Sequence, residues 1–216
     1  MSVTIYVEGG GDHNDATLTA CRKAFKIFLK RMLPGKDMPV VQACGSRESA
    51  FKDFKTALGV LAEGDCALLL VDSEDPIENN ASAWAHLANR DTWVRSIGAD
   101  DDHAHLMVQC MESWFLADPE ALSEYFNKGF KSKSLPKPVN GNIEGISKAQ
   151  VAAGLKKATR ETASKEYHKT RDGFKLLERI DPLKVIAVSK QAKRLHTILT
   201  DLLATTASVA KSRSSG

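Results

Sequence analysis

Short apolar segments alternate with longer amphipathic segments through the first half of the chain, and this alternation is the strongest constraint on its fold. The apolar segments are predicted strands at residues 3–7, 39–44, 66–71 and 105–110. Between them, apolar residues such as Ala20, Ala24 and Phe28 recur at helical spacing. Strands that alternate with helices pair in parallel, because each connection crosses back over the sheet. The sequence therefore predicts an α/β fold in which helices flank a parallel sheet.

The chain offers no candidate for a membrane segment. Its longest unbroken apolar run, Cys66 to Val71, has six residues, which is too short to span a bilayer. The N-terminal sequence MSVTIYVEGGGD lacks the basic start of a signal peptide. The four cysteines lie far apart without a C-x-x-C pair, which favours free thiols over a zinc site. We expect a cytoplasmic protein that does not contact the membrane.

Charge divides the chain into an acidic and a basic part. Residues 1–118 carry 11 Lys and Arg against 18 Asp and Glu, whereas residues 119–216 carry 19 against 9. This asymmetry favours a cation site on the first part and a polyanion-binding surface on the second, although solvated basic helix faces would give the same composition. The predicted units are an α/β domain at 1–127, a mobile basic loop at 128–146, a helical extension at 147–207 and a flexible tail at 208–216.

Acidic residues follow three of the four predicted strands. Glu8 ends the first strand, Asp72-Ser73-Glu74-Asp75 follows the third, and Glu112 follows the fourth. The carboxyl ends of parallel strands meet at one edge of the sheet, so we expect these carboxylates to lie together. Carboxylate oxygens are suitable ligands for Mg²⁺ or Mn²⁺. Each acid alone could be a helix cap, but three sets at one edge favour a metal site.

A run of three glycines, Gly9-Gly10-Gly11, follows Glu8. Backbone N–H groups in such a run can approach an anion closely at the start of the next helix, which Asp12 or Asn14 would cap. The lysine of a P-loop is missing, so the sequence does not support an ATP site. A simple tight turn is the alternative interpretation.

These motifs resemble the TOPRIM domain of topoisomerases, primases and OLD-type nucleases. The resemblance rests on Tyr6-Val7-Glu8-Gly9, as an E-G motif, and on the segment from Leu70 to Asp75, as a D-x-D motif. The stretch from Gln109 to Asp118 and the pentapeptide from Lys165 to Lys169 are similar to a bacterial family of uncharacterised TOPRIM-like proteins. The likeness covers about residues 3–200. Glutamate stands at position 74 in place of the usual second aspartate, which leaves open whether Glu74 or Asp75 is the ligand.

The resemblance implies a Mg²⁺-dependent nuclease that hydrolyses DNA or RNA, because the chain is too short for a topoisomerase or a primase. Glu8 would act as acid, base or ligand, and Asp72 and Glu74 would hold the metal. Lys169 or Lys165 would neutralise charge at the phosphate, although a solvated helix face is the alternative that either lysine taken alone favours. The full set of carboxylates assigned to the metal is Glu8, Asp72, Glu74, Asp75 and Glu112.

Nucleic acid would bind to the basic part of the chain through contacts to phosphate. The residues assigned to this surface are Lys128, Lys131, Lys133 and Lys137 in the loop and Lys165 after it. Lys156, Lys157 and Arg160, also beyond the loop, could contribute to the same surface. The resemblance also implies an ABC-type ATPase partner in bacterial anti-phage defence. Two alternatives stay open, namely a non-catalytic TOPRIM-like module that docks onto such an ATPase and a small-molecule phosphohydrolase.

Overall fold

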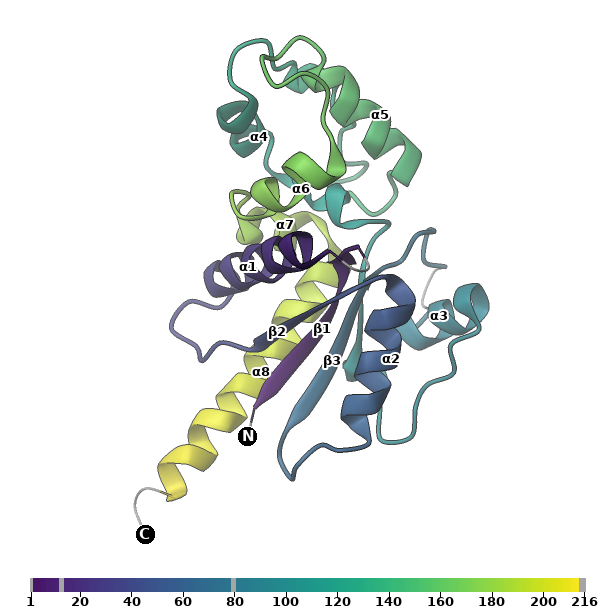
Figure 1. Ribbon diagram of the computed structural model, residues 1–216, viewed down its shortest axis with the longest axis vertical. Coiled ribbons are helices and arrows are strands. Elements are labelled where there is room, and N and C mark those ends of the chain that lie inside the picture. Colours follow the sequence, from purple (N-terminus) through teal and green to yellow (C-terminus); the bar gives the residue numbers. More distant parts are fainter. Residues whose placement is uncertain (1, 12–13, 79–80, 214–216) are drawn as a thin grey trace.

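A computed structural model describes residues 2–11, 14–78 and 81–213 of the chain (Figure 1). Within these ranges a four-stranded parallel sheet has the order β2-β1-β3-β4. The strands are β1 (Val3–Gly10), β2 (Val40–Gly45), β3 (Cys66–Asp72) and β4 (Ala104–Met107). Helices cover both faces, so the predicted α/β fold class is confirmed.

Burial along the strands explains why the sheet needs helices on both faces. Val3, Ile5 and Val7 of β1 are buried in one apolar cluster, together with α1 (Asp15–Met32) and α8 (Lys190–Arg213). In β3 every residue from Ala67 to Asp72 is buried. Side chains of a strand alternate between its faces, so a strand that is apolar throughout must be covered on both.

The opposite face of the sheet packs against α2 (Arg47–Leu58) and α3 (Ala83–Asp91). These two helices lie on the same side of the sheet in Figure 1, whereas α1 and α8 lie on the other. Phe51 of α2 stacks on Trp93, with 4.2 Å between the ring centroids. The aromatic pair closes this smaller core beside β3 and β4.

The second half of the chain is helical, as predicted, and it shares its core with the sheet. Its helices are α4 (Pro119–Phe126), α5 (Lys148–Thr159), α6 (Lys169–Leu177), α7 (Pro182–Val188) and α8, with 3₁₀ turns η2 (Met111–Ala117) and η3 (Ser132–Ser134). A further 3₁₀ turn, η1 (Asp101–His103), precedes β4. Leu122, Leu155 and Leu176 are buried in the same apolar cluster as Ile5 of β1. None of the helices in the described ranges is long and apolar enough to cross a membrane.

Helix starts follow the local signals in the sequence. Asn14 caps α1, because its side-chain oxygen accepts a hydrogen bond of 3.1 Å from the Thr17 N–H. The other predicted cap, Asp12, lies outside the described residues. The Asp-Pro pairs at Asp118 and Asp181 start α4 and α7, each with proline in the first turn.

The basic segment at residues 128–146 is anchored to the helical part. Leu135 and Ile143 are buried, and the Lys131 N–H donates to the Ala158 carbonyl over 2.8 Å. Pro136 lies against Gly154 of α5. At the other predicted boundary, α8 continues to Arg213, beyond the expected helix end at 207, and residues 214–216 lie outside the described part.

The contact between Pro136 and Gly154 provides a test of this anchoring. A Cβ atom at position 154 would overlap the proline ring, which is rigid and cannot swing aside. We expect Gly154→Ala to destabilise the protein by ~1–3 kcal/mol, although alanine is the better helix former by about 1 kcal/mol. Chemical denaturation would measure the change. Gly145→Ala is the control, since open space surrounds its Cβ position. If Gly154→Ala left the free energy of unfolding unchanged, the close contact between Gly154 and Pro136 would be contradicted.

Candidate metal site at the carboxyl edge of the sheet

Three carboxylates meet at the carboxyl edge of the sheet. Glu8 comes from β1, Asp72 from the end of β3, and Glu74 from the loop that follows. One ligand oxygen from each lies within 4.8 Å of the other two. The neighbouring parallel strands β1 and β3 bring Glu8 and Asp72 together, since Val7 pairs with Leu70 in the register. The structure therefore brings together three of the five predicted metal ligands, namely Glu8, Asp72 and Glu74.

The backbone after β3 places Glu74, and not Asp75, in this cluster. The Glu74 N–H donates to the Gln109 carbonyl over 2.8 Å, and its φ of 64° lies in the left-handed region. Such a conformation is unfavourable for a residue with a side chain and is typical of functional loops. The Asp75 carboxylate instead binds Arg90 at 2.9 Å and is 65% exposed. The conformation of one loop therefore places the Glu74 carboxylate, and not that of Asp75, beside Glu8 and Asp72.

Arg47 holds Glu8 in place, and the sequence analysis missed it. Its guanidinium lies 3.3 Å from a Glu8 oxygen and also donates to the Asp72 carbonyl. The same group binds Asp91 at 2.6 Å and lies over the Trp93 ring. One sequence feature could have indicated Arg47: it is the first residue of the helix directly after β2, and this helix start lies at the same edge of the sheet as the acids.

Lys169, the first residue of α6, brings a cation to the cluster. Its Nζ lies 3.4 Å from Glu112 Oε1 and 4.0 Å from Asp72 Oδ2. Burial lowers the pKa of Lys169, but the nearby carboxylates of Glu112 and Asp72 outweigh this effect and raise it. The side chain therefore keeps its positive charge at neutral pH.

Burial and mutual repulsion shift the protonation of the acids. Burial, together with the charge of Glu8, raises the pKa of Asp72 to about 8. Burial also raises the pKa of Glu8, while Arg47 partly opposes the shift. A bound divalent cation would relieve this repulsion, and three oxygen donors of this kind match the preference of Mg²⁺ and Mn²⁺. The donor set therefore fits the predicted metal.

A cavity of about 440 Å³ gives access to the acids. Glu8, Asp72 and Lys169 line it, and the glycine run from Gly9 to Gly11 forms part of its wall. Gly10 has a φ of 97°, and a Cβ there would lie 2.9 Å from the Leu18 backbone. Only glycine allows the chain to pass so close to α1, which leaves bare backbone facing the cavity.

Glu112 is buried beside the cluster of Glu8, Asp72 and Glu74 but does not belong to it. Its Oε1 accepts a hydrogen bond of 3.2 Å from the Tyr167 hydroxyl and lies next to Lys169. Burial and the Glu112 charge raise the pKa of Tyr167, so the phenol keeps its proton and donates. The compact group of ligand oxygens consists of Glu8, Asp72 and Glu74 alone among the described residues.

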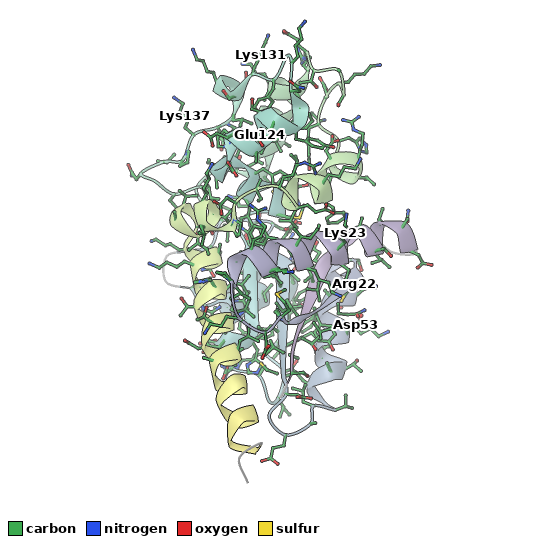
Figure 2. All side chains as sticks on the ribbon, turned by 90° about the vertical axis from the view of Figure 1, so that its left-hand side faces the viewer. Arg22, Lys23, Asp53, Glu124, Lys131 and Lys137 are labelled. Carbon is green, nitrogen blue, oxygen red and sulfur yellow. The ribbon has the colours of Figure 1, made fainter. Side chains whose placement is uncertain are left out.

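The lysines predicted to bind nucleic acid lie outside this group. Figure 2 shows Lys131 and Lys137 at the end of the molecule that carries α4 and α5. Lys131 pairs with Glu161. All five lysines are exposed, at positions 128, 131, 133, 137 and 165. Lys148 at the start of α5, which the prediction omitted, lies 2.5 Å from Glu74 and connects the helical part to the acids.

Comparison with known proteins gives one match. A family model described as a domain of unknown function, DUF4276, matches residues 7–200, a range that contains all three carboxylates of the cluster. No curated protein and no solved structure matches the chain.

The two neighbouring acids after β3 can be told apart by metal binding. We expect Glu74→Gln to weaken Mn²⁺ binding about tenfold or more, because it removes one of three charged oxygen ligands. Asp75→Asn should change the affinity less than about twofold, because that carboxylate is screened by solvent and paired with Arg90. Isothermal titration calorimetry with Mn²⁺ would measure both. The reverse ranking would place Asp75 in the site.

The raised pKa of Asp72 predicts how stability changes with pH in metal-free protein. The folded protein favours the protonated acid, so the contribution of Asp72 to stability is highest below the usual aspartate pKa and falls as the pH rises toward about 8. Asp72→Asn removes this loss, while its side-chain oxygen can still accept from the Met111 N–H. In EDTA we expect the variant to gain at least about 1 kcal/mol over wild type between pH 5 and 8.5. Urea denaturation at both pH values would measure the free energy of unfolding of the variant and of wild type. The same difference between the two proteins at both pH values would contradict the prediction.

Proposed function

The chain belongs to the DUF4276 family of domains of unknown function, and we propose that it is a Mg²⁺- or Mn²⁺-dependent nuclease that hydrolyses phosphodiester bonds in DNA or RNA. The observation that carries the proposal is the cluster of Glu8, Asp72 and Glu74, whose ligand oxygens lie within 4.8 Å of one another. Glu8 and Asp72 line an accessible cavity together with Lys169. Clustered carboxylates with an adjacent lysine suit the anionic phosphate of a nucleic acid, whose cleavage needs neutralisation of charge.

Each carboxylate has a part in holding the cation. Asp72 would bind through Oδ2, since its Oδ1 accepts a 2.7 Å hydrogen bond from the Met111 N–H. Glu8 is oriented by Arg47 and by the Asp72 N–H, which leaves its second oxygen for the metal or for a proton. A divalent cation held there supplies Lewis-acid stabilisation of charge on the phosphodiester.

Two groups of the chain itself would act on the substrate. Lys169 stays protonated and would neutralise charge that develops on the phosphate oxygens. Glu8 has a raised pKa, which makes it a better proton acceptor and donor near neutral pH than an ordinary glutamate. The bare backbone at Gly10 would leave room for the phosphate to approach.

The basic surface and the partner complete the proposal. The exposed lysines of the 128–137 segment would contact the phosphate backbone on either side of the scissile bond. The resemblance to OLD-type nucleases adds an ABC-type ATPase and a setting in bacterial anti-phage defence, in the cytoplasm.

A non-catalytic module is the second candidate, and one observation favours it. Lys148 already pairs with Glu74 at 2.5 Å, so a lysine could take the place of the cation and neutralise the cluster without metal. Such a protein would keep the fold and dock onto an ATPase. Metal-binding and cleavage measurements separate the two candidates.

Cleavage of labelled oligonucleotides in Mn²⁺ tests the nuclease directly. We expect wild-type protein to cut single-stranded or duplex DNA or RNA and to lose this activity in EDTA. Asp72→Asn should reduce the rate about 10²-fold or more, because it removes a charged ligand of the cation. Asp37→Asn, an exposed acid outside the site, is the control. Wild-type protein that binds no Mn²⁺ and cuts no substrate, alone or with its ATPase, would support the module instead.

A further inference from the structure

Lys148 of the helical half already pairs with one carboxylate of the cluster. Its Nζ lies 2.5 Å from Glu74 Oε2, whereas Lys169 contacts a different acid, Asp72, at 4.0 Å. The three carboxylates of the cluster therefore have two lysine ammonium groups beside them in the metal-free protein. The proposed nuclease assigns a part to Lys169 but none to Lys148.

The backbones on both sides of the Lys148–Glu74 pair are fixed, whereas the lysine side chain is able to move. The Glu74 N–H donates to the Gln109 carbonyl over 2.8 Å, and the Lys148 N–H donates to the Gln109 side-chain oxygen over 3.1 Å. Both partners are thus tied to one buried residue. The Lys148 side chain is 41% exposed, and its flexible four-carbon stem lets the ammonium group change partner while α5 stays in place.

Binding of a metal at the cluster competes with this ion pair. The ammonium group lies on an oxygen of Glu74 that a metal would need, and a divalent cation repels a lysine held at such a distance. Glu8 and Asp72 would still attract the metal into the cavity that they line. Lys148 would then leave Glu74 and need another anion as its partner.

A substrate phosphate beside Lys169 would provide that anion. Lys148 and Lys169 line the same pocket of about 320 Å³, between η2, α5 and the start of α6. Lys169 also lines the cavity of the acids. A phosphate paired with Lys169 would therefore place its negative charge in a space that Lys148 also faces, and a lysine forms charge-assisted hydrogen bonds with phosphate.

We propose that Lys148 exchanges partners when the site binds metal and nucleic acid. It pairs with Glu74 in the free protein and with a backbone phosphate of the nucleic acid when a divalent cation takes Glu74. Metal and nucleic acid then bind with positive coupling, because the metal releases the lysine that the phosphate receives. This inference rests on the proposed nuclease function and specifies how its site takes up metal and substrate together.

Lys148→Met tests the exchange, because it removes the charge, keeps the length of the side chain and leaves the backbone bond to Gln109 intact. Without nucleic acid, we expect the variant to bind Mn²⁺ about threefold or more tightly than wild type in calorimetry, since a competing cation is gone. With Ca²⁺ as the metal, its affinity for a fluorescent oligonucleotide should fall about threefold or more in anisotropy, since one phosphate contact is lost. A merely structural part for Lys148 would weaken both.

Two further variants assign the effect to the pair itself. Lys156→Met removes a lysine that lines the same pocket but does not pair with the three carboxylates of the described cluster, so Mn²⁺ affinity should stay within about twofold of wild type. In a Glu74→Gln background, Lys148→Met should change Mn²⁺ affinity less than about twofold, because the competition is already removed. An equal gain in affinity with and without Glu74 would contradict the exchange.

The lysine exchange and the nuclease can fail separately. If Lys148→Met bound Mn²⁺ no more tightly than wild type in the absence of nucleic acid, the exchange would be overturned, even in an active enzyme. Oligonucleotide binding that Ca²⁺ tightens by the same factor in both proteins would also overturn it. Wild-type protein that cuts no oligonucleotide in Mn²⁺ would overturn the nuclease, and the two binding assays would still decide the exchange.

Discussion

The buried carboxylate of Asp72 at the end of β3 is the constraint around which the site is organised. Moving an ionised carboxylate out of water costs several kcal/mol unless charge and hydrogen bonds compensate. The Met111 N–H and the Lys169 ammonium supply part of this compensation, but Glu8 adds a second negative charge. The pKa of Asp72 therefore rises to about 8 in the metal-free protein. The fold thus keeps the acids close together at a cost that a cation would relieve.

The helical second half provides the compensating cations. Lys169 begins α6 and Lys148 begins α5, and both reach acids that the first half presents. Burial of Leu176 and Leu155 in the same core as β1 fixes the positions of these helix starts. The acidic half of the sequence therefore contributes the carboxylates of the site, and the basic half contributes the lysines that pair with them.

Two neighbouring cavities with different linings lie where the two halves of the chain meet. One is lined by Glu8, Asp72 and bare glycine backbone. The other is lined by Glu112, whose buried Oε2 has no hydrogen-bond partner among the described residues. Lys169 lies between them and lines both.

The sequence by itself determined the α/β alternation, the helix starts and the presence of Glu8 and Asp72 at one edge, because hydrophobic period and strand ends are local properties. Tertiary structure alone decided that Glu74 and not Asp75 joins them, since one left-handed backbone conformation sets the direction of both side chains. It also decided the part of Arg47, which depends on the packing of α2 beside β1 and β3. Partners that are distant in the chain are chosen by packing, and packing leaves no periodic signal in a single sequence.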